Sequence, residues 1–238
     1  MFGLKTSSAR ANKDEAEKPF WISFSDLMTA LMVLFLVAMA VALLAVTAPA
    51  VKGNNEQRER MAAIQSCLAD LQTVTRAYPG VVLRQQSIDF GVLANFQNNS
   101  SALTQSQQEF LRRFVPRVLT IARQSVCQAW LKRVVVEGFA SQGGTYLYNM
   151  DLSAQRSERV LCALLNTDVN DPMSEEDRRM IQSLFSVGGY STSTIRKTPE
   201  ESRRIELTLE FYALREPEVI PPSPTDFDEY SSCPIGPR

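Results

Sequence analysis

The chain has 238 residues, with 25 lysines and arginines against 26 aspartates and glutamates, and a formal net charge of -1. This balance gives no basic surface of the kind that binds nucleic acid. There is no histidine, which excludes histidine-activated nucleophiles and histidine-ligated metals, and the four cysteines lack the paired spacing of a zinc site. We therefore expect no enzyme, no metal and no direct contact with nucleic acid.

The N-terminal region combines a polar segment with a long apolar one. Residues 1–18 are polar, small and charged, and we interpret them as a flexible cytoplasmic tail. Residues 19–47 are a predicted transmembrane helix, because the run from Leu27 to Val46 is almost unbroken in apolar side chains. Roughly 20 such residues span a hydrocarbon core about 30 Å thick. A signal peptide has a shorter apolar region and a small-residue cleavage site, so a retained helix is favoured.

Charges and cysteines around this span favour an internal N-terminus and an external C-terminal region. The positive-inside rule contributes only slightly, because basic residues both precede the span and follow it closely. All the cysteines lie after the span, and their even number is compatible with disulfides in an oxidising compartment or with reduced, buried thiols. They are Cys67, Cys127, Cys162 and Cys233. Cys127 and Cys162 lie within the core pattern of the following domain and the other two outside it, so we expect pairing within each set.

Residues 48–80 are predicted to form a linker helix beyond the membrane. Pro49 and Gly53 mark a break after the span. Glu56–Arg76 then carries apolar residues three or four positions apart, which is typical of an amphipathic helix. These residues are Met61, Ile64, Leu68, Leu71 and Val74.

Residues 81–214 alternate strand and helix patterns. The predicted elements, in order, are a strand at Val82–Phe90, a helix at Thr104–Ala122, a buried strand at Val134–Val136, a helix at Ser153–Leu165, a helical insertion at Ser174–Phe185 and a strand at Ile205–Phe211. This order predicts an α+β domain, a βαβαβ sandwich with helices on one face of a mixed sheet. Residues 215–238 are rich in proline, and we predict a disordered tail.

Asp26 is the one charged residue between Phe20 and Val46. An ionised carboxylate near lipid depth costs about 2.5–3.5 kcal/mol on insertion scales, which favours a partner or a water path. Ser23 and Thr29 lie three residues away on either side and share its helix face, as neighbours of an ion path would. One interpretation is a site that binds and releases an ion. The other is a solvated aspartate at the headgroup boundary.

The stretch from Glu17 to Met32 resembles the B-subunit signature of flagellar-type stators, the MotB family, and more specifically the ZorB subunits of Zorya anti-phage defence systems. The resemblance implies that Asp26 carries the transported ion, H+ or Na+, with no cofactor. It implies a bacterial inner-membrane protein with a cytoplasmic N-terminus and a periplasmic C-terminal domain. It also implies a homodimer inside a pentamer of MotA- or ZorA-like subunits, a 5:2 complex that signals indirectly to cytosolic defence effectors.

Related stators also suggest roles for the linker helix. It either pairs the two copies, plugs the channel until assembly, or packs on the domain, and the sequence leaves these alternatives open. For the whole protein, the alternatives to a defence stator are a flagellar-type stator and a passive cell-wall tether.

Residues 82–212 resemble OmpA-like peptidoglycan-binding domains. Three blocks carry the likeness, Val136–Phe139, Tyr146–Ser157 and Glu201–Glu206. In that family an Asn-x-x-Leu-Ser-x-x-Arg helix start holds the diaminopimelate of the peptide stem. The resemblance assigns this role to Asn149, Leu152 and Arg156, with Tyr148 packing on the stem or glycan.

The chemistry of this segment suits a carboxylate ligand. Arg156 forks onto the carboxylate, and helix N-terminal amides after Leu152 suit the same anion. A plain surface salt bridge from Arg156 to Asp151 or Glu137 is the alternative.

Two positions depart from the OmpA-like pattern. Ser141 stands where that family has the aspartate that pairs the ligand's ammonium, and Ser202 stands where it has an asparagine. These departures imply weakened or altered wall binding, or a domain that has lost its ligand.

Overall fold

The computed structural model describes residues 14–214 and Glu216, so most of the expected cytoplasmic tail and nearly all of the Pro-rich tail lie outside the described residues. Side chains of residues 14–20, 22, 23 and 48–50 are also outside the description. The chain divides into two compact units, residues 1–56 and residues 57–238. Each is described by itself below.

Helix α1 (Asp14–Arg76) supplies the described part of the first unit and continues into the second. Within the described residues, it is the one helix long and apolar enough to cross a membrane. The expected break at Pro49 and Gly53 is wrong, because α1 runs through both positions. A proline removes one backbone hydrogen bond and a glycine costs about 1 kcal/mol, and neither stops a helix that propagates on both sides.

In the second unit, the last turns of α1 are part of the domain core. Ile64, Cys67, Leu71 and Thr75 are buried, at the spacing of one helix face. Cys67 and Leu71 belong to the same apolar cluster as the sheet and the other helices. Among the interpretations of the linker stripe, packing on the domain is therefore the one the structure supports.

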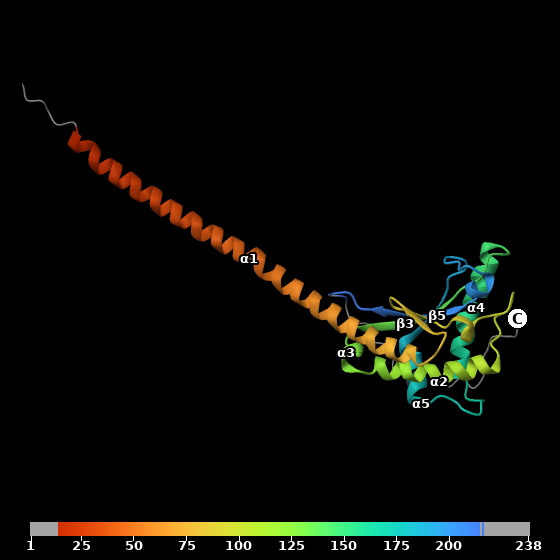
Figure 1. The fold of residues 1–238 in the computed structure, drawn as a ribbon. Helices are drawn as coiled ribbons and strands as arrows, with labels where there is room; N and C mark the ends of the chain where they lie inside the picture. Colours follow the sequence, from red (N-terminus) through yellow and green to blue (C-terminus); the bar gives the residue numbers. More distant parts are fainter. Residues whose placement is uncertain (1–13, 215, 217–238) are drawn as a thin grey trace, which may run out of the picture. The chain divides into compact units, whose positions relative to one another are not determined.

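The second unit contains a five-stranded mixed sheet (Figure 1). Its strands, in spatial order, are β1 (Val82–Arg84), β2 (Ser87–Asp89), β5 (Ile205–Phe211), β3 (Leu131–Gly138) and β4 (Phe185–Gly189). β3 and β4 are parallel and the other pairs antiparallel. The single strand expected at Val82–Phe90 is instead a hairpin, which turns at Gln85 with φ 55°. No glycine or asparagine marks this turn, so it carries none of the residue types that predict a hairpin.

The helices pack on one face of the sheet. They are the 3-10 helix η1 (Gly91–Ala94), α2 (Gln105–Ala122), α3 (Ser125–Gln128), α4 (Tyr146–Leu165), α5 (Glu175–Leu184) and α6 (Pro199–Ser202). Val134, Val136 and Leu207 point into the core on this face, whereas Glu137 and Glu206 face the other way. The predicted α2 is confirmed, with Thr104 forming a capping box with Gln107.

Two close approaches fix α4 against the sheet. A Cβ added to Gly138 would lie 1.9 Å from the Ser153 carbonyl oxygen, and one added to Gly189 would lie 2.8 Å from the Ala154 nitrogen. Only glycine allows α4 to come this near to β3 and β4. The strand β4 is absent from the elements predicted from the sequence.

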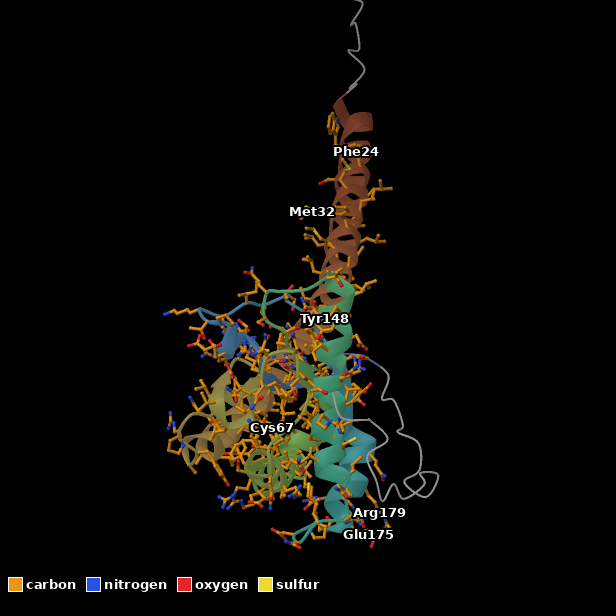
Figure 2. All side chains as sticks on the ribbon, turned by 90° about the vertical axis from the view of Figure 1, so that its right-hand side faces the viewer. Phe24, Met32, Cys67, Tyr148, Glu175 and Arg179 are labelled. Atoms are coloured by element: carbon orange, nitrogen blue, oxygen red, sulfur yellow. A yellow bond between two sulfur atoms is a disulfide. The ribbon has the colours of Figure 1, made fainter. Side chains whose placement is uncertain are left out.

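The disulfide joins Cys67 on α1 to Cys127 on α3. Figure 2 labels Cys67 among the side chains of the domain. The expected pairings, Cys67 with Cys233 and Cys127 with Cys162, are both wrong, because the end of α1 lies inside the core and not outside it. Cys162 is also disulfide-bonded, whereas Cys233 lies outside the described residues.

Candidate functional site

A polar cavity of about 190 Å³ lies where the loop after β3 meets the start of α4 and the segment before α2. Asn149, Leu152 and Arg156 line it, so the structure brings three of the predicted wall-binding residues together. Ser141 lines it from the loop. That loop ends at Gly143 and Gly144, whose φ angles of 141° and 76° favour glycine.

Arg156 is fully buried, and main-chain carbonyls hold its guanidinium. Nε donates to Ser100 O at 3.0 Å, Nη1 to Phe139 O at 2.7 Å and Nη2 to Gln97 O at 3.2 Å. Its guanidinium carbon also lies 4.9 Å from the centroid of the Phe96 ring. The surface salt bridge considered from the sequence is therefore wrong, since Arg156 is neither at the surface nor bonded to a carboxylate.

Electrostatics at this position favour an anion. Burial, and then the like charge of Arg203, lower the pKa of Arg156 to about 10. The guanidinium therefore remains charged at neutral pH. Among the described residues that line the cavity, none is an aspartate or glutamate.

The start of α4 shapes the mouth of the cavity. Thr145 caps the helix by accepting from Tyr148 N, and Asn149 Nδ2 donates to Gly143 O at 2.7 Å, which holds the glycine loop. Tyr148 is 40% exposed, and its ring lies against Gly144. Figure 2 labels Tyr148 near the start of α4.

The predicted start of α4 at Ser153 is wrong. α4 begins at Tyr146, not Ser153, so the amides after Leu152 belong to the helix interior and bond within it. They offer no anion site. Sequence reasoning also missed Asn98 and Asn99, which line the cavity from the segment before α2. Their turn-forming residue types marked a loop but not its contact with α4.

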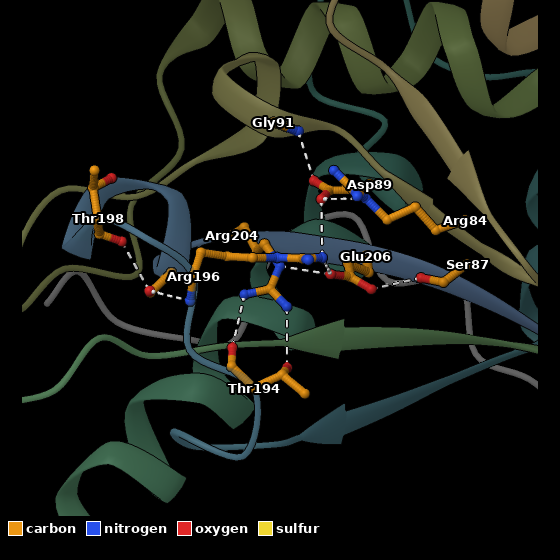
Figure 3. A network of polar contacts seen from close by, with 10 residues as sticks. Arg84, Ser87, Asp89, Gly91, Thr194, Arg196, Thr198, Arg204 and Glu206 are labelled. Atoms are coloured by element: carbon orange, nitrogen blue, oxygen red, sulfur yellow. Dashed lines mark hydrogen bonds and ion pairs between the residues drawn. The ribbon is translucent and has the colours of Figure 1, made fainter.

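A polar network surrounds the start of β5, the central strand of the sheet (Figure 3). Glu206 accepts from Arg204 Nε at 2.6 Å and from Arg196 Nη2 at 2.9 Å. Just before β5, Arg203 Nε donates to Phe96 O at 3.0 Å, and Phe96 N donates back to Arg203 O at 2.9 Å. These two hydrogen bonds fix Phe96, which lies just before Gln97 and Ser100, whose carbonyls accept from Arg156.

The serine that departs from the OmpA-like pattern belongs to the same network. Ser202 Oγ accepts from Arg196 N at 2.9 Å and donates to Thr198 O at 2.9 Å. Ser202 is buried and does not line the cavity. Its role in the described structure is to hold the turn before β5.

In the first unit, Asp26 lies on an exposed face of α1. The Thr29 hydroxyl donates to the Asp26 main-chain carbonyl at 2.8 Å and not to its carboxylate. Asp26 and Thr29 border a shallow groove that continues along the same face past Ala30, Val33 and Val37. The side chain of Ser23, the third residue predicted here, lies outside the described residues.

Known families match both parts of the chain. Residues 95–205 match the OmpA family, and residues 5–46 match the family described as membrane MotB of the proton-channel complex MotA/MotB. The Zorya protein ZorB of Escherichia coli O139:H28 (strain E24377A / ETEC) is 37% identical over 221 residues, which cover 91% of this chain and 90% of that protein. The chain belongs to the ZorB family.

Solved structures similar to this ZorB-family chain include two MotB-type proteins. A putative MotB-like protein from Desulfovibrio vulgaris is 16% identical with a TM-score of 0.43, over 67% of this chain and 98% of that one. The periplasmic domain of Helicobacter pylori MotB is 16% identical with a TM-score of 0.38, over 56% and 82%. The family confirms the expected membership, a MotB-like subunit with an OmpA-like domain that is not an enzyme.

Proposed function

We propose that this ZorB-family chain is the B subunit of an ion-driven inner-membrane stator, anchored to peptidoglycan and acting in anti-phage defence. Asp26 carries the proposal. The described side chains from Phe24 to Thr47 are exposed in the chain by itself, and Asp26 is the only charge among them. A carboxylate in such a helix requires a protein partner or a water path inside a bilayer. MotA- or ZorA-like subunits would supply it by covering the groove beside Ala30 and Val33.

The working complex holds two copies of this chain within five A subunits, and H+ or Na+ passes Asp26. The N-terminus is cytoplasmic and the second unit periplasmic, which agrees with the disulfide between Cys67 and Cys127. Damage to the envelope changes the load on the anchored dimer, and the A subunits relay the signal to cytosolic effectors.

Anchoring uses the cavity lined by Arg156. A buried guanidinium without a carboxylate partner is suited to an anionic group of the peptide stem. Asn149 and Leu152 shape the cavity, and Tyr148 packs at its mouth.

Phage plating on cells that carry the complete operon tests the proposal. We expect wild type to protect, whereas Asp26→Asn and Arg156→Ala, at matched protein level, plate phage as efficiently as cells without the operon. Arg179→Ala is the control, because Arg179 is an exposed arginine on α5 whose partner is Glu175. Full protection by Asp26→Asn would contradict ion transport and leave a passive tether. Motility without defence would identify a flagellar-type stator.

A further inference from the structure

A second pocket, of about 380 Å³, lies between the first half of α2 and the loop that joins α4 to α5. Its volume falls in the range of small-molecule sites. Of the described residues, none lines both this pocket and the cavity that contains Arg156. The ionisable residues of the second pocket are Glu109, Arg112 and Arg113 on α2, and Asp168 and Asp171 on the loop.

Arg112 is a buried cation in this pocket. The residue is 8% exposed, and its Nη1 donates to the Ala163 carbonyl oxygen on α4 at 3.2 Å. Its Nε and Nη2 make no hydrogen bond to other described residues and are still reached by solvent, so they face the pocket. This side of a guanidinium binds a carboxylate through two parallel hydrogen bonds. Since a buried charge is costly unless it is paired, a bound carboxylate stabilises this position.

Two aspartates line the pocket from the loop between α4 and α5. Within the described part of the chain, the carboxylates of Asp168 and Asp171 form no ion pair and accept no hydrogen bond. The loop leads into Met173, which is buried in the core cluster and so holds its position. Glu109 differs from them, because its carboxylate accepts from Gln105 Nε2 at 3.0 Å. The two aspartates are therefore the acids that are available to a ligand.

The cations on α2 and the acids on the loop do not neutralise one another, since no ion pair joins Arg112 or Arg113 to Asp168 or Asp171. A ligand with a single charge would satisfy one side of the pocket and leave the other unpaired. A ligand with both charges satisfies both sides.

We propose that this pocket binds a small zwitterion of the amino-acid or short-peptide class. Its carboxylate lies on Arg112, and its ammonium group lies beside Asp168 and Asp171. This inference goes beyond the proposed anchoring, which uses the cavity that contains Arg156.

Glycine peptides test the proposal, because they carry both charges and no side chain. The full-length chain, solubilised with its A subunits, is titrated by calorimetry with triglycine, with triglycine amide, which lacks the carboxylate, and with N-acetyltriglycine, which lacks the ammonium group. We expect the amide to bind at least about tenfold more weakly than triglycine, as loss of a charge-assisted hydrogen bond to a buried group does. The acetylated peptide should bind about threefold more weakly, because the aspartates are exposed. Equal affinities for the three peptides, or no binding of triglycine at about 10 mM, would overturn the proposal.

Substitutions on the loop assign the binding to this pocket. Asp168 and Asp171 are exposed, so the double variant Asp168→Asn with Asp171→Asn should keep its fold. We expect it to bind triglycine and N-acetyltriglycine equally. Glu175→Gln is the matched control, because Glu175 is an exposed acid on α5 outside the pocket, and it should keep the wild-type preference. A double variant that still prefers the free amine refutes the proposal.

Discussion

Cys67 on α1 and Cys127 on α3 are joined by a disulfide, with Cα atoms 5.3 Å apart and a sequence separation of 60. Both sulfurs belong to side chains that are at least 98% buried. The end of α1 is thus tied to the domain by a covalent bond as well as by packing. This makes residues 57–76 part of the folded unit and not a free linker.

Removing this disulfide is expected to destabilise the second unit strongly. In the chain-entropy model, opening a loop of this length costs about 4 kcal/mol. We expect Cys67→Ser, Cys127→Ser and the double variant to lower the free energy of unfolding by similar amounts. Pulse proteolysis in urea on the oxidised protein measures this quantity.

The double variant is the internal control for that experiment. Since one bond is lost in all three proteins, a double variant much less stable than either single one would show that the two cysteines act separately. Reduced wild type also loses the disulfide of Cys162, so it should be no more stable than the three variants.

Gly138→Ala is expected to push α4 away from β3. The new Cβ would lie 1.9 Å from the Ser153 carbonyl oxygen, and this backbone atom cannot rotate aside. Overpacking of this kind costs about 1–3 kcal/mol or more, and it also displaces the helix that carries Arg156. We expect lower urea resistance together with reduced sacculus binding.

Gly53→Ala is the matched control. Nothing lies within 4 Å of a Cβ at Gly53, which lies inside α1. Alanine there should leave the fold intact and favour the helix by up to about 1 kcal/mol. If Gly53→Ala lowered urea resistance and sacculus binding as much as Gly138→Ala, this result would contradict the close approach of α4 to the sheet.

Glu206→Gln is expected to remove pH-dependent stability. Burial alone would raise the pKa of Glu206, but hydrogen bonds from Ser87 and Arg204 and the charge of Arg204 outweigh burial and hold that pKa below its ordinary value. Breaking a buried pair by removing one partner costs about 3 kcal/mol. Urea unfolding of the variant should show most of this loss at neutral pH.

The sign of the pH dependence follows from the lowered pKa. The stabilisation is present above about pH 4.5, the ordinary value, and is lost as the pH falls through the lower pKa of the folded state. The wild-type advantage over Glu206→Gln should therefore shrink on acidification. Glu137 on the neighbouring strand has a raised pKa, chiefly through burial and to a smaller extent through the charge of Glu206, which the variant removes.

Glu210→Gln on the same strand is the comparison. Glu210 pairs with Arg133 at 2.6 Å, but both side chains are well exposed. Such pairs contribute about 0.2–1 kcal/mol. If Glu210→Gln lowered the free energy of unfolding as much as Glu206→Gln, this result would contradict the importance of burial in the network.

The sequence predicted elements with a strong local pattern. The span beginning at Leu27 and the helix capped by Thr104 followed from unbroken hydrophobicity and from a cap. The strand β4 did not, because Gly188 and Gly189 have weak strand propensity, and Gly189 is required there by the nearby helix α4. The disulfide pairing also failed, since it depends on where the end of α1 packs.

The candidate site was partly predictable. Similarity of motif placed Asn149, Leu152 and Arg156 on one wall of a cavity, and the structure brings them together. It could not show that Arg156 is buried and held by three carbonyls, two of them in the segment before α2. Those contacts join residues about 20 to 60 positions apart, and no local pattern encodes such distances.

The way Arg156 is held has a mechanical consequence. In the proposed anchor, a wall ligand that pulled on its guanidinium would also pull on Phe139, just after β3, and on Gln97 and Ser100 before α2. Traction is thereby divided among three stretches of chain and not concentrated on one side chain. In the proposed anchor, load on the guanidinium would therefore reach the end of β3 and the segment before α2 together.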